Sequence, residues 1–202
     1  MEVLTMPERG YHHGDLRNAL LAATRELVRQ RGARGFSVSE AARQVGVSSS
    51  APYRHFADRD ALLAATALEG FLELEEQLAE LQALETLPHT AAQITTAYLR
   101  FAHEDPARFE VMFAHGLDKT QHEDLLQQTF RIQDQLNVRM ARHLPRAQAT
   151  QRAAELWSLA HGLATLSIGG NVQHVLPEVQ IGELAASAAK AWARGLTQRP
   201  GD

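Results

Sequence analysis

The sequence contains no cysteine, no long apolar run and almost no strand signal. Without a thiol among its 202 residues, the chain has no disulfide, no cysteine nucleophile and no sulfur-ligated metal. No stretch of about 18 apolar residues is present, so a membrane-spanning helix is not predicted. Residues 1–13 also lack the apolar core of a secretory signal. These absences predict a cytoplasmic protein without a membrane partner.

Motifs that carry enzymatic chemistry are missing as well. The sequence has no glycine-rich phosphate loop, no His-Glu-x-x-His motif and no Gly-x-Ser-x-Gly motif. The Glu-x-x-His pairs of helical di-iron oxidases are also absent. The adjacent His12 and His13 have no third ligand nearby in the sequence. We therefore expect neither an enzyme nor a bound metal or cofactor, and we assign both histidines to an N-terminal arm.

Charge is unevenly distributed along the chain. The formal net charge is −4, but residues 1–60 hold nine Arg against seven Asp and Glu, which makes that quarter mildly basic. The acidic run from Glu69 to Glu80 predicts a solvated helix face. A basic N-terminal segment on an acidic remainder is typical of a nucleic-acid-reading head attached to a body with another task.

Helical periodicity runs through the chain and predicts an all-α fold of about nine helices. Period-2 alternation and hairpin turns are absent, whereas Leu16, Leu20, Ala23 and Leu27 recur at helical spacing. The predicted helices span residues 15–31, 38–45, 49–56, 59–84, 90–104, 106–116, 121–143, 148–169 and 181–197.

The segment around Gly46 carries the most specific local signals. Ser37 and Glu40 form a capping box for one short helix, and Gly46 suits a left-handed cap at its end. We expect Ser48 to cap the next short helix, where Pro52 falls early enough to be tolerated. Two short helices joined in this way have the dimensions of a helix-turn-helix.

A capped pair of short helices can also be a plain hairpin within a helical enzyme. Here small Ala42 allows the two helices to approach closely. Apolar contacts between them are available from Val45, Val47 and Phe56. The hydroxyl residues that open the second helix can reach base edges, and the Tyr-Arg-His run behind them can reach phosphates. This combination favours DNA binding.

The same residues resemble the DNA-binding domain of TetR-family transcriptional regulators. The resemblance rests on the run from Phe36 to Ser48, on Tyr53-Arg54-His55-Phe56 and on Asp60-Ala61-Leu62-Leu63. It implies a palindromic DNA operator, a homodimer and release of the operator when a small-molecule effector binds. The alternative is a related helical protein that binds a ligand or another protein and has lost operator recognition.

The chain is also similar to one TetR subgroup at two further places. Residues 10–17 resemble the start of that subgroup, which is named after a Trp…His-Gly signature matched here by Trp157, His161 and Gly162. The domains implied are an arm at 1–14, a three-helix DNA-binding domain at 15–60 with its helix-turn-helix at 37–56, and an effector-binding and dimerising body at 61–202.

The helix-turn-helix residues and the family resemblance together give a set of candidate DNA contacts, in which the resemblance implies the roles of Ser39, Ser49, Ser50, Tyr53, His55 and Arg59. The candidates are Ser39, Ser48, Ser49, Ser50, Tyr53, Arg54, His55 and Arg59. Pro52 stands where the family usually has Leu, Ile or Phe, which leaves the orientation of the serines open.

Aromatic and sulfur-containing side chains in the body are candidates for the effector pocket. They are Phe101, Phe109, Met112, Phe113, Phe130, Trp157 and His161. Each of these apolar residues can equally be ordinary core, and His161 suits either a pocket or a helix contact.

The last two predicted helices mix small and large apolar residues, which permits close approach of helices. We expect them to form the dimer interface through Leu156, Ala160, Ala164, Ala185, Ala189 and Trp192, although packing within one chain is the alternative. A twofold dimer would engage two DNA half-sites about 34–36 Å apart.

Overall fold

The structure is a computed structural model that describes residues 13–197, with side-chain surroundings from residue 16 to 196. Over this range every regular element is a helix, which confirms the predicted all-α class. The predicted N-terminal arm, including His12, lies mostly outside the described residues. His13 begins the first helix, two residues earlier than predicted.

Nine α-helices and two short 3₁₀ helices make up the described part of the chain. In order they are α1 (His13–Arg31), α2 (Val38–Val45), η1 (Ala51–Arg54), α3 (Arg59–Ala79), α4 (Leu87–Glu104), α5 (Pro106–Met112), η2 (Lys119–Gln121), α6 (Glu123–Ala141), α7 (Arg146–Ile168), α8 (Asn171–Val175) and α9 (Ile181–Thr197).

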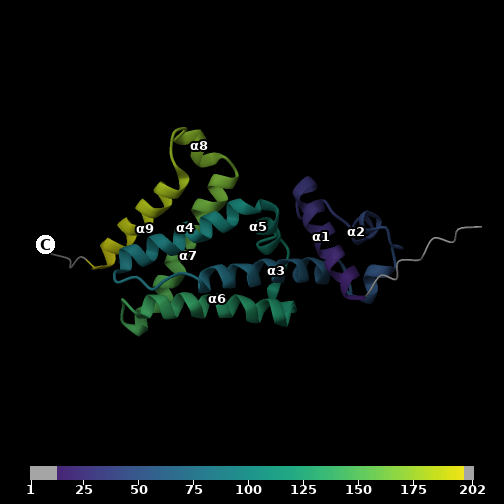
Figure 1. Ribbon diagram of the computed structural model, residues 1–202, viewed down its shortest axis with the longest axis horizontal. Helices are drawn as coiled ribbons and strands as arrows, with labels where there is room; N and C mark the ends of the chain where they lie inside the picture. Colours follow the sequence, from purple (N-terminus) through teal and green to yellow (C-terminus); the bar gives the residue numbers. More distant parts are fainter. Residues whose placement is uncertain (1–12, 198–202) are drawn as a thin grey trace, which may run out of the picture.

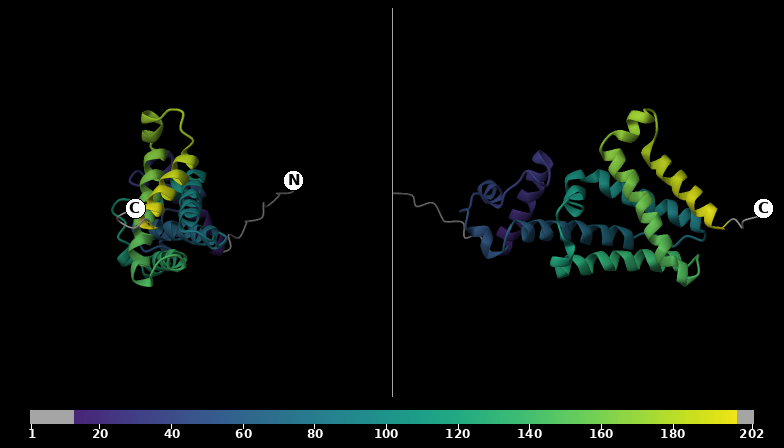
Figure 2. Two further views of the ribbon diagram at one scale, coloured as in Figure 1. Left: turned by 90° about the vertical axis from the view of Figure 1, so that its left-hand side faces the viewer. Right: turned by 180° about the vertical axis from the view of Figure 1, so that it is seen from behind.

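The molecule is elongated, with a small head at one end of its long axis (Figure 1). The head consists of α1, α2 and η1, and α3 starts against it and continues along the body, where α6 runs beside α3 (Figures 1 and 2). The predicted domain boundary at residue 60 therefore falls in the first turn of α3. One continuous helix joins the two parts.

The caps of α2 form as the sequence predicts. The Ser37 side chain accepts a hydrogen bond from Glu40 N, and the Glu40 carboxylate accepts from Ser37 N. Gly46 has φ 80° and ψ 28°, and its N–H points to the carbonyls of Ala42 and Arg43. These local signals fix a helix of eight residues with a sharp end.

The predicted helix 49–56 is wrong. Only one 3₁₀ turn, Ala51–Arg54, is regular, and no side chain caps it. Pro52 has no N–H to continue an α-helical ladder, and it disfavours the α conformation at the residue before it. Ala51 N instead reaches Ser48 O at 3.0 Å, while the buried Pro52 accepts at its carbonyl from His55 N and Phe56 N.

Other helix boundaries differ from the predicted ones, and Pro88 begins a helix instead of ending one. The helix predicted to reach residue 84 ends at Ala79, and Pro88 lies in the first turn of α4, where its missing N–H costs nothing. Asp58 caps α3 as predicted, accepting from Ala61 N at 2.7 Å. The short helix α8 was not predicted.

Close packing fixes α5 against α3. A Cβ on Gly70 of α3 would lie 2.7 Å from both Cγ and Sδ of Met112, so only glycine allows this approach. Met112 has no exposed area, and Phe71 next to Gly70 is also buried. The α5 helix therefore has a fixed place beside α3, between the head and the rest of the body.

Gly46→Ala should lower the free energy of unfolding by about 1–2 kcal/mol, because alanine is strained at a positive φ. No atom lies within 4 Å of the added Cβ, so the effect comes from the backbone. Urea unfolding at one protein concentration measures it. Gly182→Ala on α9, also in open space, is the control and should be neutral or stabilising. Equal losses in both variants would contradict this account of the cap.

Candidate nucleic-acid interface and ligand cavity

Most of the predicted DNA contacts lie on the open surface of the head. Ser39 is exposed on α2, and the three serines before η1 are exposed as well. Tyr53 is 54% exposed and Arg54 is exposed beside it. These residues, namely Ser39, Ser48, Ser49, Ser50, Tyr53 and Arg54, are called the serine-tyrosine face below.

Pro52 anchors the turn that Ser48, Ser49 and Ser50 form before η1. The proline ring is buried, and Ser48 and Ser50 share a hydrogen bond between their hydroxyl oxygens at 3.2 Å. The turn is therefore a compact, hydroxyl-rich loop rather than the first turn of an α-helix. Donors and acceptors of this kind can bond base edges or phosphate oxygens.

The other two predicted DNA contacts, His55 and Arg59, are partly buried in the head. His55 is half-buried, with its ring centroid 6.3 Å from that of Phe56. Arg59 donates to the carbonyls of Ala33 and Phe36, and its guanidinium lies 4.7 Å from the centre of the Phe36 ring. The structure thus places Arg59 across the loop between α1 and α2, where it holds the head together.

Arg43 is a further basic side chain on this surface that the sequence prediction did not include. It follows Ser39 by four residues on α2, so both side chains lie on the same exposed face of that helix. Its side chain is 77% exposed and 3.9 Å from Glu40. The i, i+4 spacing from Ser39 was the signal that could have identified it.

The body contains a cavity of about 290 Å³. Residues of α3, α4, α6 and α7 surround it, and most of its wall is apolar. Phe71, Leu74, Ile94, Leu136 and Ala160 form much of this wall. Pockets for small ligands are commonly lined in this way, with a few polar groups among hydrophobic side chains.

Polar side chains interrupt this apolar wall at several places, with Thr129 and Gln133 on α6 among them. Lys119 of η2 lines the cavity with its Nζ 4.4 Å from the Phe71 ring and 4.8 Å from the Phe113 ring. Burial lowers the pKa of Lys119 to about 8. On another side, the Tyr98 hydroxyl and His161 Nδ1 are hydrogen-bonded at 2.9 Å. Burial, together with the charge of Lys119, lowers the pKa of His161.

The predicted pocket residues divide into three groups. Phe113, Phe130 and Trp157 line the cavity. Phe109 and His161 contact Phe113, and their ring centroids lie 5.0 Å and 4.4 Å from its ring centroid. Both residues line a second, neighbouring pocket. Phe101 and Met112 have no exposed area and belong to the core, so these two assignments were wrong.

The predicted dimer interface is also wrong in its residues. Leu156, Ala160, Ala164, Ala185 and Ala189 are at most 1% exposed within a single chain, so they cannot form a surface. The small side chains of the four alanines instead allow α4, α7 and α9 to pack closely in one protomer. Trp192 is half-buried, and its indole N–H donates to Glu155 at 3.3 Å.

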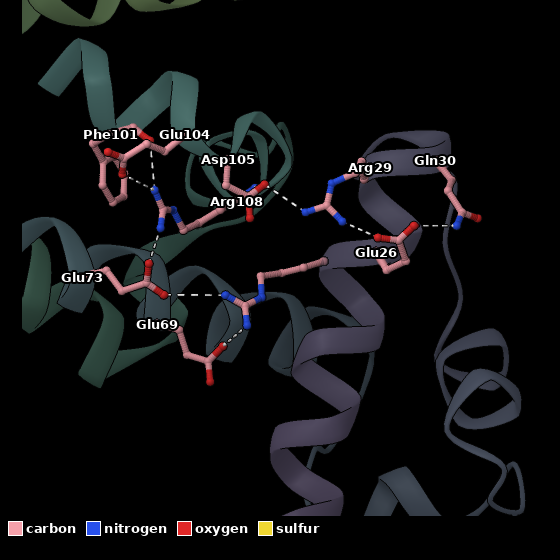
Figure 3. Close-up of polar contacts among 10 residues, drawn as sticks. Glu26, Arg29, Gln30, Glu69, Glu73, Phe101, Glu104, Asp105 and Arg108 are labelled. Atoms are coloured by element: carbon pink, nitrogen blue, oxygen red, sulfur yellow. Dashed lines mark hydrogen bonds and ion pairs between the residues drawn. The ribbon is translucent and has the colours of Figure 1, made fainter.

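Charged side chains tie α1 of the head to α3 and α5 of the body (Figure 3). Arg25 of α1 lies 3.6 Å from Glu73 and 3.9 Å from Glu69, both on α3. Arg29 of α1 reaches Asp105, the residue that caps α5, at 3.2 Å.

A backbone contact reinforces this joint. Glu110 of α5 accepts from Ala33 N at 2.7 Å, just after α1 ends. The interactions among α1, α3 and α5 are called the head-body joint below. Phe113, which follows α5 directly, lines the cavity. The short helix α5 therefore contacts the head and leads directly into a residue of the cavity wall.

Two family comparisons agree with this arrangement. Residues 20–66 match the family described as "Bacterial regulatory proteins, tetR family". Residues 91–194, about half of the chain, match "Tetracyclin repressor-like, C-terminal domain". The chain belongs to the TetR family. As a TetR-family protein it is a transcriptional regulator, and the Trp…His-Gly subgroup is not confirmed by these matches.

Solved structures similar to this TetR-family chain share its fold over nearly the whole length. A protein of unknown function from Rhodococcus sp. RHA1 is 30% identical, with a TM-score of 0.75 over 95% of this chain and 100% of that chain. FadR from Bacillus subtilis, in complex with stearoyl-CoA, is 12% identical, with a TM-score of 0.66 over 88% and 98%. No curated protein matches the sequence.

Two structural observations bear on partners and metals. No helix within residues 13–197 is both long and apolar enough to cross a membrane. In the same described part of the chain, no group of three or more His, Asp or Glu side chains is arranged to hold a metal ion.

Arg59→Met should lower the free energy of unfolding by about 1–3 kcal/mol, because two part-buried carbonyls lose their donor. Arg54→Met, on the exposed surface beside Tyr53, is the matched control and should change stability by less than about 0.5 kcal/mol. Urea unfolding of both variants makes the comparison. If the two losses are equal, Arg59 has no special part in holding the head.

Proposed function

We propose that this regulator binds a palindromic DNA operator as a homodimer and leaves it when a small molecule enters the cavity. The observation that carries this proposal is the short helix α5, which joins the cavity wall to the head through the head-body joint. The serine-tyrosine face supplies the DNA contacts, and the apolar body supplies the sensor. Cytoplasmic action follows from binding DNA.

The DNA contacts divide by chemistry. Tyr53, Arg54 and Arg43 suit phosphate oxygens, because they extend from the exposed surface and donate hydrogen bonds. The hydroxyls of Ser49 and Ser50 suit base edges, because they are short and lie at the tip of the compact turn. Arg59 stabilises the head instead, since its guanidinium already bonds two backbone carbonyls.

The dimer contact is proposed for the outward face of the last long helices. On α7, Ala154, Ser158, Gly162 and Leu166 recur every four residues and are exposed or half-buried. Leu166 is 50% exposed. Small residues in such a stripe let helices of two chains approach closely. Exposed Ser187, Ala191 and Gly195 make a similar stripe on α9.

The coupling step uses α5. A ligand that displaces Phe113 also displaces α5, because Phe113 is the residue that ends this helix. Movement of α5 alters the contacts of Asp105 with Arg29 and of Glu110 with Ala33 N. Since these contacts orient α1, the spacing of the two heads in the dimer changes. The stearoyl-CoA bound by FadR, which has a similar fold, supports an apolar effector.

Arg54→Met should weaken binding to all DNA sequences and reduce the dependence of log affinity on log salt by about one phosphate contact. The measurement is fluorescence anisotropy on DNA selected from a random pool and on mixed-sequence DNA. Ser50→Ala should change mainly the preference between the two DNAs. Arg146→Met, on the exposed start of α7, is the charge-matched control and should have no effect.

The alternative function, an interaction protein without operator recognition, predicts a different result in this experiment. In that case no salt-dependent DNA binding is observed for the unmodified protein. Equal effects of Arg54→Met and Arg146→Met would show that DNA contacts lie elsewhere on the chain.

Leu166→Glu should shift the protein from dimer to monomer, because it adds a charge to a closely packed helix face. Sedimentation equilibrium measures the molecular mass at several concentrations. Val138→Glu on α6 is the matched control, since Val138 is 60% exposed and lies outside the proposed interface. A dimer that survives Leu166→Glu with unchanged affinity would contradict this interface.

A further inference from the structure

The cavity holds one cationic side chain within a largely apolar wall. Lys119 is one of only two lysines in the sequence, beside 18 arginines, and the other is Lys190 on α9. No ion pair joins Lys119 to a carboxylate within the described part of the chain. Its neighbour Asp118 is already engaged, accepting from Thr120 N at 3.0 Å and from Thr120 Oγ1 at 2.6 Å. The ammonium is therefore held by aromatic rings alone.

From this arrangement we infer that the cavity binds a small apolar carboxylate whose carboxyl group pairs with Lys119. This inference rests on the proposed role of the cavity as the effector site and specifies the chemical class of the effector. The hydrocarbon part would lie against the apolar walls from α3, α4 and α6, with Leu74, Ile94 and Leu136 among its contacts.

Charge decides between the possible classes of ligand. A cationic ligand would have to use the faces of Phe71 and Phe113, but the Lys119 ammonium already lies against both rings. A neutral ligand would leave the half-buried ammonium without a counter-charge. A carboxylate removes that cost, because a charge-assisted hydrogen bond in a partly desolvated site is stronger than one in water.

Size limits the length of the acid. A cavity of 290 Å³ has room for about ten water-sized groups. An unbranched acid of eight carbons has ten non-hydrogen atoms and fills this space. A longer chain would have to leave the cavity past Phe130 and Trp157, which are 54% and 39% exposed.

Three octyl compounds that differ in charge test the inference: octanoate, octan-1-ol and octyltrimethylammonium. Binding to the full chain is measured by calorimetry, below the concentration at which each compound aggregates. Reductive methylation with a ¹³C label gives a second readout, because the chain has only two lysine side chains to label. Lys119→Met and Lys190→Met assign the two lysine resonances and separate them from that of the terminal α-amine.

Octanoate should bind at least about tenfold more tightly than octan-1-ol, and octyltrimethylammonium should bind more weakly than either. Octanoate should shift the Lys119 resonance and leave that of Lys190 in place. Lys119→Met should remove the preference for octanoate and change octan-1-ol binding less than about threefold, which shows that the cavity is still formed. Lys190→Met should change neither affinity.

Several outcomes overturn the inference. They are equal binding of octanoate and octan-1-ol, a preference for octyltrimethylammonium, an octanoate affinity that survives Lys119→Met, and no binding of any probe. Salt-dependent DNA binding is measured separately and without these compounds. A failure there rejects the proposed regulator mechanism, whereas a failure of the octyl series alone rejects only the ligand class.

Discussion

The contacts of the buried Arg108 side chain are the constraint on which the arrangement of head and body depends. Its guanidinium, in a residue only 8% exposed, pairs with Glu73, donates to the Phe101 carbonyl at 2.9 Å and lies 3.9 Å from the centre of the Phe101 ring. A buried charge is tolerated only when it is paired and hydrogen-bonded. Arg108 therefore fixes α5 against α3 and α4 in one position (Figure 3).

The head depends on the same carboxylate. Glu73 also lies 3.6 Å from Arg25 of α1, so one acidic side chain serves an arginine of the head and an arginine of the body. Exposed ion pairs contribute little by themselves, and those of α1 are partly solvated. Their contribution is geometric, because they connect α1 with α3, and the proposed mechanism uses them as contacts that are weak enough to change.

Local signals in the sequence predicted the elements that depend on local chemistry. The capping box at Ser37 and the left-handed Gly46 set the two ends of α2, and both signals lie in the local sequence. The segment behind it could not be predicted in the same way. There, the missing N–H of Pro52 and the burial of its ring select a compact turn, although the surrounding residues favour a helix.

The burial of single residues and the packing partners of helices were harder to predict than the helices themselves. An alanine-rich stripe predicts close helix packing but does not identify the partner helix. The prediction therefore puts Ala164 and Ala189 at a contact between two chains, whereas both are buried within one chain. In the same way, helical spacing cannot separate a core phenylalanine such as Phe101 from a cavity residue such as Phe113. Lys119 begins a 3₁₀ helix of three residues, which is too short for periodicity to give a signal, and only the fold brings it to the cavity.

The position of Lys119 connects ligand charge with the response of the head. Only the segment from Phe113 to Asp118 separates α5 from η2, so in the proposed mechanism a carboxylate paired with Lys119 acts on the chain that leaves α5. The same ligand displaces the Lys119 ammonium from the Phe113 ring, which it touches before binding. A ligand shifts a conformational equilibrium only by its difference in affinity for the two states. In the proposed mechanism, pairing with Lys119 supplies such a difference, because it draws the ammonium away from the ring of Phe113, the residue that follows α5.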